Sequence, residues 1–391
     1  MHTTRSTPAL LALALGYFSL GTASLAVVGL SAPISADLLV APATVGLLVT
    51  VFALTFAVAA PLAPVVLGRM DRKRQLLLGL ALLTVGGLAA AAAPTYAALT
   101  GARVLAALGA AIFGPAASAA GSLLVPAEQR QRALTTVFSG MAVATVLGVP
   151  LASFLGNGLG WRPAMLGVAV LAAVGLALVA AIVPPIETGT RPTARSYRTV
   201  LTGGGVLPMV ATTLLTLAAQ FTVYGVAGTY LAECYGAGPG LVSVTLLVFG
   251  AIGVVGNASS ARLGVRLGGT RTVTLALAGM AVVFAALLTT PPAMAVGIAV
   301  FAVWAFFSQL FVAPQQARLV TLLPDQRAIV LALNASALYL GMSLGSLLGS
   351  TLLPRTGAAL VPAVALLLLA SAGAAHAASS RRVVPTAVPI S

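Results

Sequence analysis

Apolar runs of a length that crosses a lipid bilayer recur along the whole chain of 391 residues, and short polar segments separate them. A membrane-spanning helix needs about 20 predominantly apolar residues. On this pattern we predict twelve spanning helices, at residues 9–32, 42–66, 75–93, 96–120, 133–156, 163–183, 206–231, 240–261, 271–290, 293–315, 327–352 and 357–378. The first run exceeds the apolar core of a signal peptide, which has about 7–15 residues, so we interpret it as a span. The pattern therefore predicts an all-α membrane protein.

Most of the 20 basic residues fall in alternate segments between these runs. If the amino terminus lies inside the cell, the inner segments hold nearly all of them, including Arg318 after the tenth span. Arg162 and Arg355 then lie outside, and Arg103 lies within the fourth span. Cytoplasmic loops of membrane proteins carry the excess of Lys and Arg. We therefore predict that both termini are cytoplasmic and that the protein resides in a bacterial inner membrane.

Composition supports this class and argues against others. The sequence is 60% hydrophobic and 7% charged, whereas soluble domains carry about 25% charged residues. The net charge of +14 does not predict nucleic-acid binding, because the basic residues lie in short segments between apolar runs. No phosphate-binding loop of ATP-driven proteins occurs, and two histidines and one cysteine do not make a metal site. We expect no enzyme activity and no cofactor, and a monomer whose partners are a small-molecule substrate and membrane lipid.

The chain divides near its middle into two similar halves. The longest polar segment, 184–205, separates a predicted N-terminal six-helix bundle, 1–183, from a C-terminal six-helix bundle with a short tail, 206–391. Similar polar segments, 126–130 and 324–327, precede the fifth and eleventh spans, and regularly spaced glycines follow each. Repeated halves are typical of transporters that bind their substrate near the midplane.

Four segments resemble the major facilitator superfamily, and within it the twelve-span drug:proton antiporters near the arabinose-efflux-permease and chloramphenicol-exporter branch. Residues 68–74 are similar to the G-x-x-x-D-R-x-G-R-R loop after the second span, and residues 262–268 to its second-half copy. Residues 103–109 resemble the R-x-x-x-G motif of the fourth span. Residues 148–162 resemble the G-V-P…G-W-R run of the fifth helix in this branch. The resemblance implies a proton-coupled exporter of a small amphipathic drug, antibiotic or metabolite that works by alternating access.

Arg103 has the clearest functional case among the single residues. An arginine about 10 Å inside a span is costly unless it faces a cavity or a partner. The resemblance implies that it contacts the first helix and takes part in coupling; a structural arginine bound to backbone carbonyls is the alternative. Exporters of this branch place a glutamate in the first span, where this chain has Ser24. Asp37, Glu233 and His376 are then the candidates for a titratable coupling group, with an interfacial role as the alternative.

For the substrate cavity we select mid-span polar and aromatic side chains that share a helix face. Besides Arg103, Ser24 and Asp37, the candidates are Tyr17, Phe113, Gln220, Tyr224, Asn257, Trp304, Phe307, Asn334 and Tyr339. Hydrogen bonding between helices is the alternative role for the amides. A cavity with few fixed charges favours a neutral or weakly charged amphipathic ligand.

Gating residues are expected at the inner ends of the helices. The resemblance implies that the loop with Arg69, Asp71, Arg72 and Arg74 pairs the second and eleventh helices when the carrier faces outward. Glu128 with Arg130 and Asp325 with Arg327 are candidate inner-gate pairs, and simple topological anchoring is the alternative. Gly148 and Pro150 allow close approach and a kink in the fifth helix.

Three functions stay open at this point. The first is export of a small amphipathic compound. The second is uncoupled facilitation, or import, of a small neutral metabolite on the same fold. The third, which the sequence supports least, is a transporter-like sensor.

Overall fold

The computed structural model describes residues 3–126, 129–186, 198, 200, 205–289, 293–323 and 326–382, and these residues are helical or form short turns. Twelve helices in this part of the chain are long and apolar enough to cross a membrane, which confirms the predicted number. The predicted linker lies mostly outside the described residues, so the boundaries of the two halves stay a prediction.

The N-terminal half contains the first six spans. Its helices are α1 (Thr3–Gly29), α2 (Ser31–Leu38), α3 (Pro42–Val66), α4 (Arg72–Ala91), α5 (Tyr96–Leu123), α6 (Arg130–Val143), the π-helix η2 (Ala144–Gly148), α7 (Val149–Leu159) and α8 (Trp161–Ile182). The fifth span is therefore one rod made of α6, η2 and α7. A single π-turn of this kind is frequent at functional sites.

The C-terminal half repeats the arrangement. Its helices are α10 (Val206–Tyr224), α11 (Ala227–Tyr235), α12 (Pro239–Leu267), α13 (Gly269–Thr289), α14 (Met294–Leu322), α15 (Arg327–Thr356), the short η4 (Ala358–Leu360) and α16 (Val361–Arg382). Several predicted boundaries differ from the structure. The first span ends at Gly29 and the seventh at Tyr224, each followed by a short second helix, while α14 and α15 run past their predicted ends.

Local sequence explains several helix ends. The Asp71 side chain accepts a hydrogen bond from the Arg74 amide and caps α4, and Thr95 caps α5 in the same way. Gly160 and Gly268 adopt φ values of +96° and +80° in the tight turns that join α7 to α8 and α12 to α13. A left-handed backbone of this kind favours glycine, so both turns depend on it.

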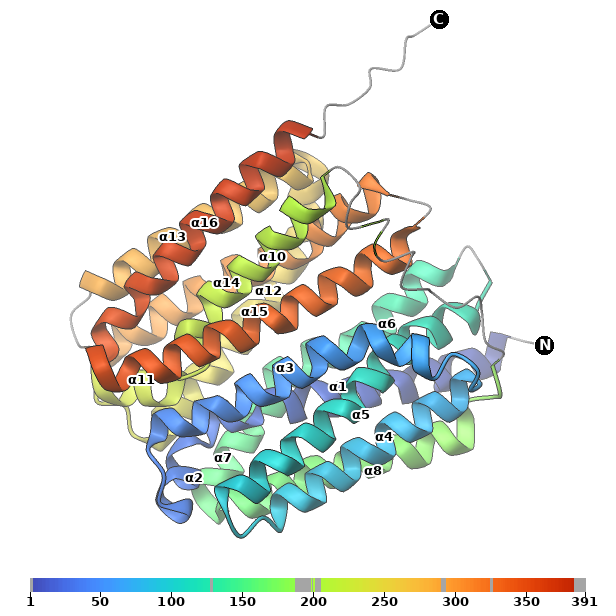
Figure 1. Ribbon diagram of the computed structural model, residues 1–391, viewed down its shortest axis with the longest axis horizontal. Coiled ribbons are helices and arrows are strands. Elements are labelled where there is room, and N and C mark those ends of the chain that lie inside the picture. The colour runs from blue at the N-terminus through green and yellow to red at the C-terminus, as the bar shows by residue number, and fades with distance from the viewer. Residues whose placement is uncertain are drawn as a thin grey trace, which may run out of the picture.

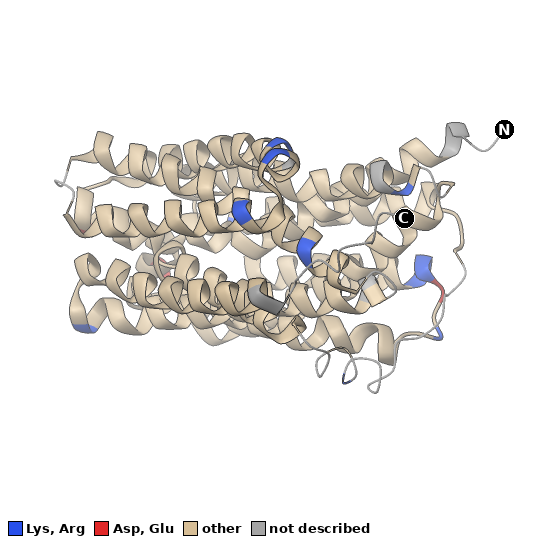
Figure 2. Cartoon of the chain, turned by 90° about the horizontal axis from the view of Figure 1, so that it is seen from above, with Lys and Arg blue, Asp and Glu red and all other residues tan. Residues whose placement is uncertain are grey.

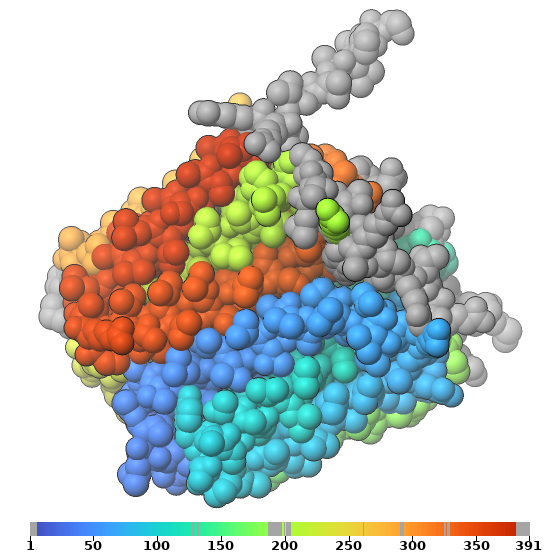
Figure 3. Space-filling view, viewed as in Figure 1, coloured from blue at the N-terminus to red at the C-terminus, as the bar shows by residue number. Residues whose placement is uncertain are grey.

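The two halves lie side by side and both termini lie at one end of the molecule (Figure 1). We call this the terminal end and the other the opposite end. Helices α3 and α15 run next to each other along the seam, and their surfaces meet along it in the space-filling view (Figure 3). Most of the Lys and Arg segments lie toward the terminal end (Figure 2).

Glycines set the close packing inside each half. On α15, Gly341, Gly345 and Gly349 face the carbonyl oxygens of Leu214, Ala218 and Thr222 on α10. In the first half, Gly140 faces the carbonyl of Ala14 on α1, and Gly148 faces Thr22. A side chain at these glycines would collide with the neighbouring helix, so small residues permit the close approach. The glycine spacing noted in the two halves thus performs the same task in each.

Candidate functional site

The candidate site lies at the seam between the halves. Tyr339 of α15 stacks on Phe56 of α3, with ring centroids 3.7 Å apart and an angle of 23° between the rings. The Tyr339 phenol also lies beside the Ser24 side chain of α1. We call Ser24, Phe56 and Tyr339, together with Tyr17, the central cluster. The structure thus joins three predicted site residues and adds Phe56.

Tyr17 is held firmly in the first half. Its hydroxyl donates to the carbonyl of Gly114, 2.8 Å away, and contacts the Ser118 hydroxyl at the same distance. Its ring meets Phe113 edge to face, with centroids 5.8 Å apart. Phe113 is fully buried between helices, so it supports Tyr17 from behind. The central cluster is therefore backed by a rigid aromatic layer.

Arg103 lies directly behind Ser24. It is 3% exposed, and its guanidinium donates to the backbone carbonyls of Ala23 and Ser24, the latter at 2.8 Å. The guanidinium carbon also lies 4.4 Å from the centre of the Phe52 ring. The contact with the first helix agrees with the resemblance, and the carbonyl partners agree with the structural alternative. A role for Arg103 in transport stays a prediction.

The predicted residues of the second half do not form a single cluster. The Ser308 hydroxyl donates to the Gln220 amide oxygen inside this half. Trp304 is fully buried among aromatic rings that include Tyr224, 6.1 Å away between centroids. Phe307 packs against Gly279 of α13, about one helical turn along α14 from Trp304. The apparent aromatic stripe on the tenth span therefore divides between core contacts.

Asn334 and Asn257 have different surroundings. The Thr213 hydroxyl donates to the Asn334 amide oxygen at 2.7 Å, which joins α10 to α15. Asn257 is exposed on α12, two helical turns from Gly250, which contacts the backbone of Thr145 in the first half. Residues seven apart share a helix face. Asn257 thus lies on the α12 face that is turned toward the first half.

The halves are joined at the opposite end. The hydroxyls of Ser153 on α7 and Ser243 on α12 lie 2.6 Å apart, and Ser153 also donates to the carbonyl of Gly29. Toward the middle, the hydroxyls of Ser346 and Ser343 on α15 donate to the carbonyls of Gly46 and Thr50 on α3. The described hydrogen bonds between the halves thus gather in the middle and at the opposite end.

The predicted gating loop makes its described contacts within the first half. Asp71 caps α4 and forms an ion pair with Arg74 at 2.9 Å. Arg72 donates to Gln75, whose amide in turn bonds the carbonyls of Leu67 and Met70. Arg69 is exposed. Glu128 and Asp325 lie outside the described residues, as does the side chain of Arg327, while Arg130 is exposed at the start of α6. Pro150 is buried in the first turn of α7, two residues after Gly148.

Asp37, a coupling candidate, forms an ion pair at the opposite end. Its carboxylate lies 2.5 Å from the Arg162 guanidinium and 3.1 Å from the Trp161 indole nitrogen. These hydrogen bonds, chiefly the one from Arg162, hold the pKa of Asp37 below its ordinary value. Arg162 also donates to the carbonyl of Ala93, so the pair ties α2 to the turn after α4. The other candidate acid, Glu233, is exposed on α11.

Arg318 corrects a sequence-based interpretation. The sequence places it in an inner loop, but α14 continues to Leu322 and buries it at 8% exposure. Its guanidinium donates to Gln315, to the His376 ring and to the Ser379 hydroxyl, at 2.8–2.9 Å. Arg103 is therefore not the only embedded arginine. Partners 58 and 61 residues away left no local signal in the sequence.

Comparison with known proteins agrees with this architecture. The sequence profile of the Major Facilitator Superfamily matches residues 11–346. The chain is 30% identical over 373 residues to the inner membrane transport protein YdhP of Escherichia coli O157:H7, which covers 92% of this chain and 94% of that protein. It is 30% identical over 359 residues to the uncharacterized MFS-type transporter YtbD of Bacillus subtilis (strain 168), covering 90% and 89%.

Solved structures share the fold. A D-xylose-proton symporter superposes with a TM-score of 0.75 at 15% identity, covering 94% of this chain and 97% of that one. A bacterial homolog of the human lysosomal transporter Spinster, in an inward-facing and occupied conformation, gives a TM-score of 0.77 at 15% identity and covers 98% of both chains. At this identity the likeness concerns the fold alone. The family profile and the relatives together establish that this chain belongs to the Major Facilitator Superfamily and is a multi-pass membrane transporter.

Proposed function

We propose that this transporter exports a small, neutral or weakly charged amphipathic compound by alternating access. The observation that carries the proposal is the central cluster, whose side chains are aromatic or bear hydroxyl groups and carry no charge. The nearby cation, Arg103, is engaged by backbone carbonyls of α1. Apolar surfaces with a few placed polar groups suit ligands of this kind. The direction of transport rests on the resemblance of residues 148–162 to the exporter signature.

In the proposed orientation both termini are cytoplasmic, and the protein is a monomer in a bacterial inner membrane without a cofactor. The contact between Ser153 and Ser243 then lies on the periplasmic side. The described hydrogen bonds between the halves correspond to a state that is closed to the periplasm.

The test uses everted membrane vesicles and a panel of neutral amphipathic compounds, beginning with radiolabelled chloramphenicol. An exporter should accumulate at least one compound in these vesicles. Tyr339→Ala removes the ring stack and the hydroxyl and should reduce that accumulation more than tenfold. Tyr339→Phe keeps the ring stack and removes only the hydroxyl; the loss of one polar contact of about 0.5–1.5 kcal/mol would reduce accumulation about 2- to 12-fold.

Tyr96→Phe is the matched control. It removes a different tyrosine hydroxyl, which donates to the backbone carbonyl of Thr44 at 2.7 Å, and Tyr96 lies outside the central cluster. Accumulation should stay near the wild-type level. Equal activity of Tyr339→Ala and wild type would contradict the proposed site. Uptake into right-side-out vesicles, with none into everted ones, would contradict export.

Proton coupling is part of the proposal, with Asp37, Glu233 and His376 as the candidate groups. A facilitator without coupling is the second candidate, and the observation that favours it is Ser24, a neutral residue where related exporters have a glutamate. An imposed pH gradient separates the two in proteoliposomes. Accumulation of the transported compound driven by the pH gradient supports coupling, whereas a counterflow rate that does not depend on the gradient supports the facilitator.

A further inference from the structure

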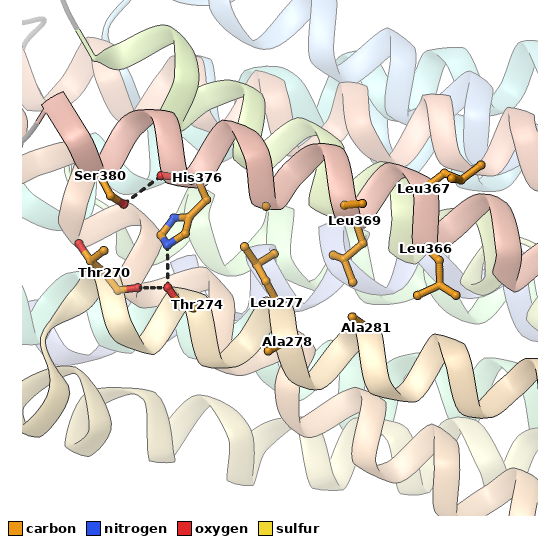
Figure 4. Close-up of a pocket in the computed structure, with 13 residues that line it drawn as sticks. Thr270, Thr274, Leu277, Ala278, Ala281, Leu366, Leu367, Leu369, His376 and Ser380 are labelled. Carbon is orange, nitrogen blue, oxygen red and sulfur yellow. Dashed lines mark hydrogen bonds between the residues drawn. The ribbon is translucent and has the colours of Figure 1, made fainter.

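A lateral groove of about 730 Å³ runs between α13 and α16 on the outside of the second half. Its walls are formed mostly by Leu, Ala and Gly residues. Its polar groups gather toward the terminal end and belong to Thr270, Thr274, His376 and Ser380 (Figure 4). It extends from Leu366 to Ser380 on α16, which at 1.5 Å per residue is about 21 Å. One leaflet of a bilayer core is about 15 Å thick. The groove is therefore long enough to hold an acyl chain.

The corresponding place in the first half is closed. Helices α4 and α8 pack closely there. A Cβ placed at Gly87 would lie only 2.9 Å from the Cβ of Ala169, so the glycine permits the close approach. In the groove, by contrast, a Cβ at Gly373 would meet no atom within 4 Å. The open groove is thus a feature of the second half and not a general consequence of the fold.

A buried cation lies behind the polar end of the groove. Arg318 donates to the Nδ1 atom of His376, so the other ring nitrogen, Nε2, carries the proton and donates to Thr274 at 2.9 Å. His376 is therefore neutral, and the guanidinium keeps a full positive charge. Among the described residues Arg318 forms no ion pair. Arg271, in the first turn of α13, is exposed nearby and adds positive charge.

We propose that this groove binds one anionic phospholipid, with an acyl chain along the groove and the phosphate at the end formed by His376, Thr274 and Ser380. The apolar walls match the chain, and the unpaired charge of Arg318 matches the phosphate. Basic pockets between spanning helices recognise anionic headgroups in this way. A zwitterionic phospholipid such as phosphatidylcholine satisfies the walls and also carries a phosphate, but its quaternary ammonium group offsets that negative charge at the polar end of the groove.

The experiment measures phosphatidylglycerol binding to the purified full-length protein by native mass spectrometry and by the melting temperature in detergent. Phosphatidylcholine with the same chains and inorganic phosphate are the comparison probes. Gly373→Phe fills the groove, and Gly167→Phe on α8 is the control, because that glycine also has no neighbour within 4 Å. Arg318→Gln keeps hydrogen-bonding groups and removes the charge.

Wild type and Gly167→Phe should retain phosphatidylglycerol in preference to phosphatidylcholine and melt at a higher temperature with it, and inorganic phosphate alone should have no effect. Gly373→Phe should lose the retained lipid while melting as wild type does without lipid. Arg318→Gln should bind phosphatidylglycerol about fivefold more weakly and lose the preference. The proposal would be overturned if both lipids were retained equally or if Gly373→Phe bound phosphatidylglycerol as well as wild type does. It would also be overturned if the wild-type protein were a dimer and Gly373→Phe a monomer, because the groove would then be a protein interface. If Arg318→Gln does not fold, Gly373→Phe still decides the outcome.

Discussion

Gly345 offers a sharp test of the packing inside the second half. It lies on α15 against α10, and a Cβ at this position would collide with the carbonyl oxygen of Ala218 and lie 2.9 Å from the backbone nitrogen of Thr222. Both neighbours are backbone atoms, so neither can rotate away. We predict that Gly345→Ala destabilises the protein even though alanine is the better helix former.

The magnitude follows from two opposing effects. Replacing glycine with alanine in a helix stabilises it by about 1 kcal/mol. Forcing a methyl group into a packed contact costs about 1–3 kcal/mol. The net loss for Gly345→Ala is therefore about 0–2 kcal/mol. Gly101→Ala on α5 is the control, because a Cβ there meets no atom within 4 Å and only the helix gain applies.

The assay is thermal unfolding of both purified variants in the same detergent. The quantity measured at each temperature is the fraction of protein that remains monodisperse on gel filtration after heating. Gly345→Ala should melt below wild type and Gly101→Ala at or above it. If Gly345→Ala melted above wild type, as Gly101→Ala is expected to do, the result would refute the close approach of α10 and α15.

Three further predictions concern the site and the two ends. Arg103→Ala removes two hydrogen bonds to α1 and the contact with Phe52, and it should abolish transport without loss of membrane-inserted protein, as measured by vesicle uptake and immunoblot. In a chain that also carries Cys234→Ser, the double variant Ser153→Cys and Ser243→Cys should form a disulfide, because the two hydroxyls lie 2.6 Å apart. Oxidation should stop transport and a reductant should restore it. Failure to form the cross-link would contradict the closed opposite end. The lowered pKa of Asp37 means that its ion pair stabilises the fold above the ordinary value of 3.8 and that this contribution disappears as the pH falls through the lowered pKa. The melting difference between wild type and Asp37→Asn should therefore be constant from neutral pH to about pH 5 and vanish in stronger acid.

The number and order of the spanning helices could be predicted because a bilayer imposes a length and a composition on every span. The positions of the helix ends were harder to predict from the sequence. The tenth span was expected to end at residue 315 where polar residues begin, yet α14 continues through Arg318 to Leu322. The helix tolerates these residues because Gln315 donates to the Met209 carbonyl and Arg318 bonds His376. Such partners depend on tertiary packing, which a periodic pattern does not encode.

The candidate site was predicted in part for the same reason. Tyr17, Ser24 and Tyr339 lie near one another in the structure, because polar and aromatic side chains in the middle of spans pack against partners. Phe56 was missed, since one phenylalanine among many apolar residues carries no distinct signal. Trp304 was selected by residue type, but its size makes it the centre of an aromatic core instead. Residue type thus identified the chemistry, and only the packing distinguished the seam from the core.

The serine at position 24 changes the physical character of the seam. A carboxylate at this place would pair with the guanidinium of Arg103, which lies directly behind it. With serine there, Arg103 donates to the carbonyls of Ala23 and Ser24, and the serine side chain lies beside Tyr339 of the other half. The contacts across the seam are then neutral, each of about 0.5–1.5 kcal/mol. A ligand that replaces these contacts in one state can shift the equilibrium between states by a few kcal/mol of differential binding, so the central cluster can respond to a neutral ligand without a change of charge.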